Sequence, residues 1–320
     1  MAKDIYTRVF EAGVVPVVKI DRVEDALPLA KAFIDGGIDV AEITFRTECA
    51  AEAIKAITTA YPDMLVGSGT VLTTEQVDAS IEAGAQFIVS PGLKVNIVKY
   101  CQSKNIPILP GCTNPSDVEQ AIELGLKYVK FFPAEASGGL NYINALSGPF
   151  PQIKFMPTGG VNEDNLQAYM QSDKIIACGG TWMCKASDIN SKDYPKITEL
   201  TKSAIRKIHN FKVAHIGING ENEKEAKDLA NLLSLTFGLD KTEGNSSFFV
   251  SKEIEIVKEP YLGKNGHIAI ACNNLKRAEA YLIKQGFTIN QDTYKEKNNK
   301  TVAVYLNEEF GGFAVHLLQR

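Results

Sequence analysis

A lysine flanked by aromatic residues is the first feature of the sequence that suggests chemistry. Residues 127–135 read Lys-Tyr-Val-Lys-Phe-Phe-Pro-Ala-Glu, and the aromatic and β-branched residues before the proline predict a short strand. Because side chains alternate along a strand, Tyr128, Lys130 and Phe132 share one face. We therefore expect Lys130 to lie between two aromatic rings, and Lys127 to be a solvated surface residue.

Burial of Lys130 would decide its chemistry. A buried ammonium without a partner is unfavourable, so burial favours the neutral amine. A neutral amine attacks a ketone and forms a Schiff base. The same sequence is also compatible with a structural lysine whose stem packs on the rings while its ammonium reaches solvent.

Composition places the chain among ordinary globular proteins. It has 320 residues, of which 45% are hydrophobic and 22% are charged, and this length favours about two domains. The formal net charge of -4 gives no reason to expect nucleic acid or a membrane surface as a partner. The six cysteines form no C-x-x-C pair, and neither an apolar signal segment nor an apolar run of about 18 residues is present, so we expect a cytoplasmic protein.

Short apolar runs alternate with amphipathic stretches through the first part of the chain. Eight runs predict strands at residues 14–20, 40–45, 65–71, 87–91, 107–111, 128–133, 154–159 and 175–180. Helix-like segments lie between them, for example at residues 23–34, 50–60, 74–83 and 115–124. Eight strand-helix units predict an α/β fold, a parallel (β/α)8 TIM barrel over residues 1–208, with a doubly wound open sheet as the alternative.

Both folds carry their chemistry at the carboxyl ends of the strands. In the second run, Glu42, Thr44 and Arg46 share one parity, which puts a carboxylate, a hydroxyl and a guanidinium on one face. An internal Glu42–Arg46 ion pair is the structural explanation, although a buried pair is unfavourable unless further hydrogen bonds complete it. Ser68 and Thr70 are related in the same way in the third run.

Two further strand ends are rich in glycine. Residues 157–162 read Pro-Thr-Gly-Gly-Val-Asn, and residues 178–182 read Cys-Gly-Gly-Thr-Trp. They follow the seventh and eighth predicted strands, where backbone amides and a helix N-terminus commonly hold a phosphate, although each is also compatible with a tight turn. Together with an amine, a carboxylate for proton transfer and an arginine for a substrate carboxylate, they indicate carbon–carbon cleavage of a phosphorylated 2-keto acid.

These residues resemble the 2-dehydro-3-deoxy-6-phosphogluconate aldolase / 4-hydroxy-2-oxoglutarate aldolase family of class I Schiff-base aldolases. The resemblance rests on eight motifs in order, at residues 15–18, 42–47, 67–71, 90–92, 109–111, 130–135, 157–161 and 179–182. It implies that Lys130 forms the Schiff base, Glu42 is the general acid and base, and Arg46 binds the pyruvate carboxylate. It further implies a site for the pyruvyl unit at Thr70, Pro91 and Phe132, and a phosphate site at Gly159, Gly160, Gly179, Gly180 and Thr181.

The reaction implied by the resemblance is reversible cleavage of 2-dehydro-3-deoxy-6-phosphogluconate to pyruvate and glyceraldehyde 3-phosphate, with no cofactor beyond the covalent imine. The resemblance also implies a homotrimer. The 6-phosphogalactonate stereoisomer and 4-hydroxy-2-oxoglutarate, which gives pyruvate and glyoxylate, stay open as substrates. A phosphosugar-binding regulator is the alternative from another class of protein, and it is disfavoured because binding alone needs no buried amine.

An internal repeat marks residues 212–320. His-Ile-Gly-Ile-Asn-Gly-Glu-Asn at 215–222 is echoed by His-Ile-Ala-Ile-Ala-Cys-Asn-Asn at 267–274. Each copy is followed by a helical stretch, at 223–235 and 275–285, and then by strands, at 248–257 and 302–318. Two β-α-β-β-β modules of this kind form a smaller α+β domain that resembles the vicinal-oxygen-chelate, or glyoxalase-like, superfamily.

This second resemblance implies one metal ligand from the first strand and one from the last strand of each module. The corresponding residues are His215, Glu255, His267 and His316, which suit a divalent ion such as zinc or nickel. His316 stands where glutamate is usual in the superfamily, and Glu253 competes with Glu255 for the register. A histidine that opens an apolar strand is also often a hydrogen-bonded structural residue. The domain is expected to be an accessory module or, in a bifunctional protein, a metal-dependent glyoxalase-like enzyme.

Overall fold

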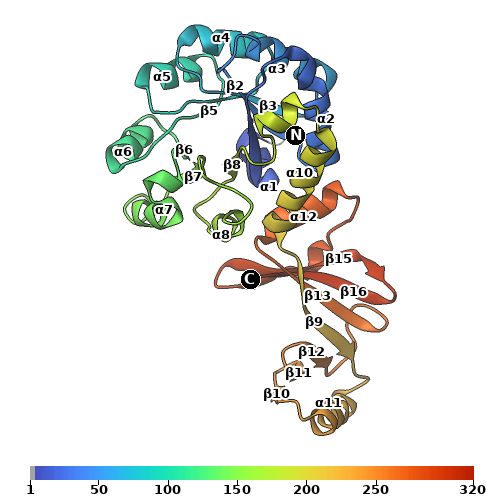
Figure 1. Cartoon of the computed structure of the whole chain (residues 1–320). Helices are drawn as coiled ribbons and strands as arrows, with labels where there is room; N and C mark the ends of the chain where they lie inside the picture. The colour runs from blue at the N-terminus through green and yellow to red at the C-terminus, as the bar shows by residue number, and fades with distance from the viewer. Residues whose placement is uncertain (1–3) are drawn as a thin grey trace. The chain divides into compact units, whose positions relative to one another are not determined.

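The computed structural model describes residues 4–320, which divide into two compact units with the boundary between Ile208 and His209. The first unit runs from blue to yellow in Figure 1, and the second continues through orange to red. Among the described residues, no helix is long and apolar enough to cross a membrane.

Eight parallel strands form the first unit. They are β1 (Val14–Val18), β2 (Val40–Thr44), β3 (Leu65–Gly69), β4 (Phe87–Val89), β5 (Ile108–Leu109), β6 (Tyr128–Phe131), β7 (Lys154–Pro157) and β8 (Cys178–Gly180). Six of them pair in the order β5-β4-β3-β2-β1-β8, and β6 pairs with β7. Parallel bridges between Gly111 and Lys130 and between Thr158 and Gly179 join the two sheets at both seams. The ring therefore closes, which confirms the predicted barrel and makes the open-sheet alternative wrong.

Helices follow the strands in the order that the sequence predicts. They are α1 (Ile5–Ala12), η1 (Val23–Asp25), α2 (Ala26–Asp35), α3 (Ala50–Ala60), α4 (Thr74–Glu82), α5 (Val95–Ser103), α6 (Pro115–Glu123), η2 (Glu135–Ser137), α7 (Gly139–Ser147), α8 (Leu166–Met170), α9 (Ala186–Asn190) and α10 (Tyr194–His209). The side chains of Asp4, Thr73 and Asn114 accept hydrogen bonds from backbone amides in the first turns of α1, α4 and α6. Such caps satisfy amides that the helix itself leaves unpaired, which explains where these helices begin.

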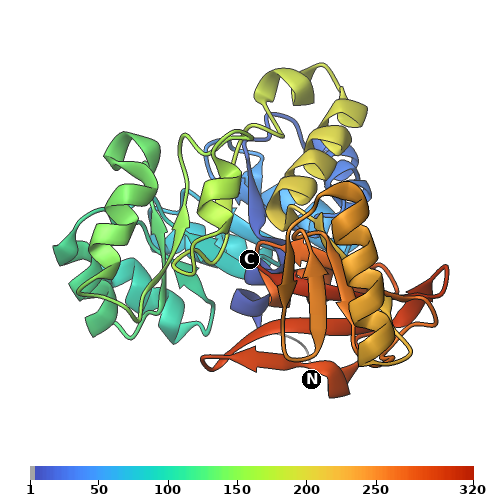
Figure 2. The ribbon, with the colours of Figure 1, turned by 90° about the horizontal axis from the view of Figure 1, so that it is seen from below.

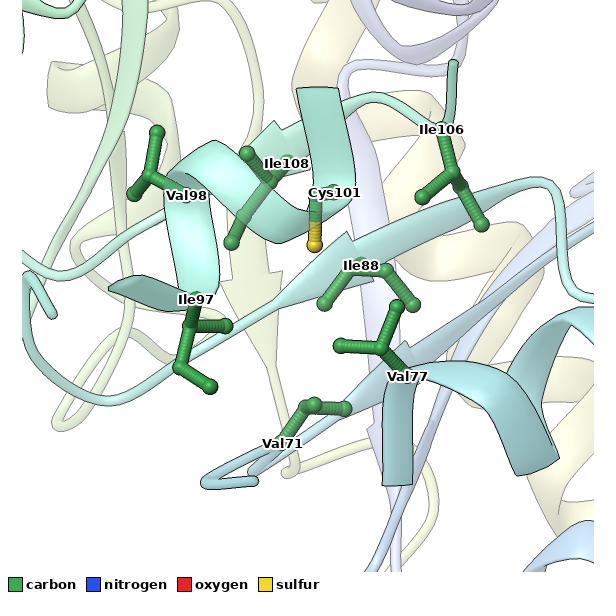
Figure 3. Close-up of a cluster of buried hydrophobic side chains, with 8 residues drawn as sticks. All are labelled: Val71, Val77, Ile88, Ile97, Val98, Cys101, Ile106 and Ile108. Atoms are coloured by element: carbon green, nitrogen blue, oxygen red, sulfur yellow. The ribbon is translucent and has the colours of Figure 1, made fainter. Parts of the chain in front are cut away.

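Apolar packing holds the helices on the outer face of the ring, and in Figure 2 the blue-to-green strands lie inside helices of the same colours. Figure 3 shows one part of this layer, where α4 and α5 pack against β4, β5 and adjoining loops through Val71, Val77, Ile88, Ile97, Val98, Cys101, Ile106 and Ile108. Each of these side chains is at most 8% exposed. Burying an aliphatic side chain of this size contributes roughly 1.5–3 kcal/mol. The outer face thus supplies stability, and the inner face can carry polar side chains.

The second unit is one eight-stranded sheet made of two β-α-β-β-β modules, as the sequence predicts. The first module consists of β9 (Lys212–Asn219), α11 (Glu223–Phe237), β10 (Lys241–Glu243), β11 (Ser247–Val250) and β12 (Ile254–Val257). The second consists of β13 (Gly266–Cys272), α12 (Leu275–Lys284), η3 (Gln291–Thr293), β14 (Lys295–Lys297), β15 (Lys300–Phe310) and β16 (Phe313–Gln319). The strand order is β10-β11-β12-β9-β13-β16-β15-β14.

The two modules meet at their first strands. β9 and β13 run antiparallel at the centre of the sheet, and each has the last strand of its own module, β12 or β16, parallel on its other side. This register puts His215 and His267 at equivalent positions of the central strands, and Glu255 and His316 at equivalent positions of the flanking strands. The sequence repeat is therefore an approximate twofold repeat in space, which gathers the four candidate ligands in the middle of the sheet.

Candidate functional site

Lys130 lies inside the barrel with a carboxylate as its partner. Its Nζ is 3.3 Å from Oε1 of Glu42, and the two side chains are 6% and 0% exposed. Lys130 comes from β6 and Glu42 from β2, which are opposite each other in the closed ring. The barrel thus brings an amine and a carboxylate that are 88 residues apart in the sequence into one buried pair.

The expectation that Lys130 lies between two aromatic rings holds for one ring and is wrong for the other. The Phe132 ring centroid is 5.4 Å from Nζ of Lys130. The Tyr128 ring instead stacks on Tyr6 of α1, with the ring centroids 4.3 Å apart. The Tyr128 ring, which strand parity predicts beside Lys130, therefore packs on α1, the helix before the first strand. Lys127 is exposed, as expected.

Glu42 has one oxygen in the ion pair, and its other oxygen, Oε2, is buried without a hydrogen-bond partner among the described residues. A buried unsatisfied carboxylate oxygen is unfavourable, and such groups are typical of sites that a ligand completes. Space beside this carboxylate is tight, because a Cβ atom on Gly69 would lie 2.1 Å from Oε1. The glycine at position 69 therefore allows the carboxylate to lie directly against β3.

Arg46 and Thr70 lie on the turns that follow β2 and β3. Arg46 is exposed, and the described ion pair of Glu42 is with Lys130, so the alternative of an internal Glu42–Arg46 pair is wrong. Thr44 donates a hydrogen bond to the carbonyl of Val18 at 2.7 Å and belongs to the barrel wall. Thr70 has a φ of 57°, a left-handed conformation that is uncommon for threonine. Backbone strain of this kind is concentrated at functional sites.

Both glycine-rich loops need glycine for their own packing. Gly159 and Gly160 have φ values of 95° and 85°, in the region that favours glycine. A Cβ atom on Gly160 would lie 2.6 Å from the Glu135 side chain, and one on Gly180 would lie 2.0 Å from the Trp182 ring. These contacts support the tight-turn explanation directly, so a phosphate site at the two loops stays a prediction.

The remaining predicted residues also lie at strand ends. Pro91 follows β4 and is partly exposed, and Thr181 follows β8 and is exposed. Gly179 is buried, and a Cβ atom there would lie 2.2 Å from Oγ1 of Thr158. Thr158, which sequence reasoning did not select, holds a buried hydroxyl without a partner among the described residues. Strand parity could have identified Thr158. It lies two residues beyond Met156, which is opposite Lys130 in the pairing of β6 with β7.

Four side chains converge in the second unit. The Nε2 atoms of His215 and His267 are each 3.1 Å from Oε2 of Glu255 and 3.1 Å from one another. His316 completes the group, since the ligand atoms of the three histidines lie within 4.8 Å of one another. The predicted ligand positions thus form one cluster of three imidazoles and a carboxylate, a donor set that suits a divalent ion.

Two members of this cluster, His316 and Glu255, have pKa values shifted toward the forms that bind metals. Burial, followed by the neighbouring His267, lowers the pKa of His316 to about 4, so its imidazole is neutral at neutral pH. Burial alone would raise the pKa of Glu255, but hydrogen bonds from His215 and His267 outweigh it and lower that pKa below its ordinary value. Neutral imidazoles and an ionised carboxylate are the ligating forms. Glu253, the residue that a different strand register would have put in place of Glu255, is exposed on the turn before β12.

A cavity of about 810 Å³ lies over the cluster. Its lining includes the four candidate ligands and several residues that sequence reasoning missed, among them Lys295, Tyr261 and Tyr305. Tyr305 is opposite His316 in the pairing of β15 with β16, and their ring centroids are 4.8 Å apart. The register of this hairpin would have revealed Tyr305, but the sequence alone does not fix it.

Comparison with known proteins identifies relatives of the first unit. Residues 5–200 match the family model "Aldolase: KDPG and KHG aldolase". The 2-dehydro-3-deoxy-phosphogluconate aldolase of Haemophilus influenzae is 46% identical over 203 residues, which are 63% of this chain and 96% of the relative. The KHG/KDPG aldolase of Escherichia coli K12 is 43% identical over 192 residues, which are 60% of this chain and 90% of the relative.

A solved structure shows the same fold. The KDPG aldolase from Legionella pneumophila, with pyruvate captured at low pH as a covalent carbinolamine intermediate, matches with a TM-score of 0.61 and 39% identity. The match covers 63% of this chain and 99% of the other. The likeness therefore extends over a whole relative and over the barrel of this chain.

Proposed function

Because residues 5–200 make this chain a member of the KDPG and KHG aldolase family, a family of aldehyde-lyases, we propose that its barrel cleaves 2-dehydro-3-deoxy-6-phosphogluconate to pyruvate and glyceraldehyde 3-phosphate. The observation that carries the proposal is the buried Lys130–Glu42 pair, with 3.3 Å between amine and carboxylate. The carbinolamine in the Legionella pneumophila enzyme supports covalent chemistry with pyruvate in a relative.

The pair can perform each chemical step. In our proposal, Lys130 gives a proton to Glu42 and attacks C2 of the substrate. A second proton passes from the nitrogen to the C2 oxygen, and Glu42 then returns the first proton, so that this oxygen leaves as water and a protonated imine remains. Glu42 then takes the proton of the C4 hydroxyl while the C3–C4 bond breaks, and the electron pair of that bond moves into the protonated imine to give an enamine. Protonation of C3 and hydrolysis of the imine release pyruvate and restore the amine.

The other predicted residues bind the substrate in this proposal. Arg46 holds the carboxylate through its planar guanidinium, and Thr70, Pro91 and Phe132 shape the site of the pyruvyl unit. The phosphate is held by the backbone and hydroxyl groups of the two loops, at Gly159, Gly160, Gly179, Gly180 and Thr181. All of these positions lie at or just beyond the carboxyl ends of β2, β3, β4, β6, β7 and β8, where barrel enzymes place their active sites.

Mass spectrometry after incubation with pyruvate and borohydride tests the mechanism. Wild-type protein is expected to carry a reduced pyruvyl adduct, and Lys130→Met is expected to carry none, because its side chain cannot form an imine. Lys127→Met is the matched control, since Lys127 precedes the same strand but is exposed. Wild-type protein without an adduct would refute the Schiff-base mechanism.

Substrate range and assembly are further parts of the proposal. The galactonate stereoisomer and 4-hydroxy-2-oxoglutarate are alternative substrates, and kcat/KM for each of the three compounds ranks them. We also propose a homotrimer in the cytoplasm, with residues 1–208 and 212–320 as the two domains. Sedimentation velocity tests the trimer, and a monomeric species at micromolar concentration would contradict it.

For the second unit we propose a glyoxalase-like divalent metal centre with His215, Glu255, His267 and His316 as ligands. The convergence of four donors supports it, and the pKa values of two of them, Glu255 and His316, are shifted toward the ligating forms. When bound, such an ion supplies a Lewis acid. The unit acts as an accessory module, and a bifunctional enzyme with glyoxalase-like activity here is the alternative.

Metal analysis after zinc loading and desalting tests this centre. About one zinc per chain is expected for the wild type, following the single four-donor site. His316→Ala removes one donor and should lower zinc retention strongly. Glu253→Gln, on the turn next to Glu255 but outside the cluster, should retain wild-type zinc content. Equal retention by the two variants would exclude this ligand set.

A further inference from the structure

The pocket over the cluster has a charge balance that a bound ion would invert. Its lining contains three carboxylates, from Glu223, Glu255 and Glu259, and two ammonium groups, from Lys258 and Lys295. These five groups leave one net negative charge, which a divalent ion turns into one net positive charge. An anionic ligand is therefore favoured in the pocket once the ion is bound.

The two lysines differ in what they can offer to a ligand. Nζ of Lys258 is 2.7 Å from Glu223 and 3.1 Å from Glu243, and it lies 4.8 Å from the centroid of the Phe248 ring. Lys258 is thus engaged by the protein itself. Lys295, the first residue of β14, is exposed and appears in no ion pair among those of the described residues. It is the cation that a ligand in the pocket can reach.

Lys295 also lies close to the candidate metal ligands. In the sheet, Lys295 is opposite Ala303 of β15, and Ala303 is opposite Leu318 of β16, two residues beyond His316. All four residues line the pocket. An ammonium in the wall of the pocket that also holds the candidate ligands can share an anion with an ion bound there. The lysine and the cluster therefore define two ends of one anion-binding position.

The size and polarity of the pocket indicate the rest of the ligand. About 810 Å³ is much more than a three-carbon acid occupies and lies in the range typical of pockets for organic molecules. The lining combines apolar side chains with hydroxyl and amide groups, namely Phe249, Val257, Val302 and Leu318 with Tyr261, Tyr305, Asn245 and Ser246. Apolar walls accept the C–H faces of a carbon chain, and the polar groups can bind its hydroxyls.

We propose that this pocket binds a hydroxylated carboxylate of sugar-acid size, with the carboxylate between the bound ion and Lys295. The inference rests on the proposed metal centre and names the class of ligand for that site. Compounds of this class are also the proposed substrates of the barrel. The second unit thereby binds the same kind of compound that the first unit turns over.

Calorimetric titration of full-length, zinc-loaded Lys130→Met protein tests the inference, because this variant cannot capture a ligand covalently in the barrel. D-gluconate is the probe, and D-glucitol is the neutral analogue with the same number of carbons. Gluconate is expected to bind, glucitol is not, and removal of zinc should weaken gluconate binding at least tenfold. Adding Lys295→Gln should weaken it roughly three- to tenfold, whereas Lys297→Gln, on the same strand but outside the pocket, should leave it unchanged.

Zinc content measured after each titration separates the two ways in which the inference can fail. Protein that holds no zinc overturns the metal centre and the ligand together. Protein that retains zinc but does not bind gluconate overturns the ligand alone. Equal binding of glucitol, or equal effects of the substitutions at Lys295 and Lys297, also overturns the ligand alone.

Discussion

Replacing Gly69 by alanine tests whether the position of the Glu42 carboxylate controls catalysis in the barrel. The added Cβ atom would lie 2.1 Å from Oε1 and 2.6 Å from Cγ of Glu42. Gly69 does not have a positive φ, so alanine is compatible with the backbone. The substitution therefore acts through this contact and leaves both Lys130 and Glu42 in the sequence.

The size of the effect follows from the overlap. Ordinary carbon–oxygen contacts need more than 3 Å, so the carboxylate must move by about 1 Å, and its Oε1 is the atom that pairs with Lys130 at 3.3 Å. A displacement of about 1 Å in a catalytic group can lower the rate about 10²-fold, which corresponds to about 2.7 kcal/mol. Forcing an extra methyl group into this wall should also destabilise the barrel by about 1–3 kcal/mol.

Pyruvate release coupled to lactate dehydrogenase measures kcat, and thermal unfolding followed by circular dichroism shows whether the variant is folded. Gly92→Ala is the matched control, because Gly92 also follows a barrel strand and no atom lies within 4 Å of its added Cβ. We expect kcat to fall about 10²-fold for Gly69→Ala and to stay near the wild-type value for Gly92→Ala. A folded Gly69→Ala protein with wild-type kcat would refute the role assigned to the Glu42 carboxylate.

Further predictions concern both units. Glu42→Gln should lower kcat by about 10²–10⁴-fold because it removes the general acid and base, and unchanged kcat in the coupled assay would contradict this role. Arg46→Gln should raise KM for the phosphorylated keto acid about tenfold or more, and an unchanged KM would remove Arg46 from the substrate carboxylate. Gly217→Ala should lower zinc affinity about 10–100-fold, because the added Cβ atom would lie 2.0 Å from the His267 ring. Competition with a chelating dye measures the zinc affinity, and a wild-type value would contradict this prediction. Burial, then the nearby charge of Arg277, lowers the pKa of His209 from 6.5 to about 3, so its contribution to stability is present above pH 6.5 and is lost as pH falls toward 3. Urea unfolding between pH 7.5 and 4, followed by circular dichroism, should therefore show a weaker acid dependence for His209→Phe than for the wild type, and equal slopes would contradict the assignment.

Strand parity was sufficient to select Lys130 and Glu42 but not to pair them. Parity says which face of a strand a side chain occupies, whereas the Lys130–Glu42 contact depends on the closure of the ring, which sets β2 opposite β6. Parity also fails beyond the end of a strand. β2 ends at Thr44, so Arg46 lies on an exposed turn and does not share the buried face of Glu42.

In the second unit, the repeat predicted the modules and the histidines at their starts, because a duplicated segment is visible in the sequence itself. The lining of the pocket was not predictable in the same way. Lys295 and Tyr305 come from the last three strands of the second module, whose register is interrupted by irregularities in both hairpin pairings. Such interruptions change which residues face the pocket, and alternation alone cannot locate them.

The approximate twofold repeat of the second unit separates the charge of the candidate metal centre from its geometry. Duplication of one ancestral module would supply two copies of each ligand position, and either copy can change while the paired strands keep the other in place. Glu255 and His316 occupy such equivalent positions with different charges. Replacing the residue at one of these two positions therefore alters the net charge around the bound ion by one unit, while the sheet stays the same. Descendants of one duplicated gene can in this way diverge in the ions and anions that they accept.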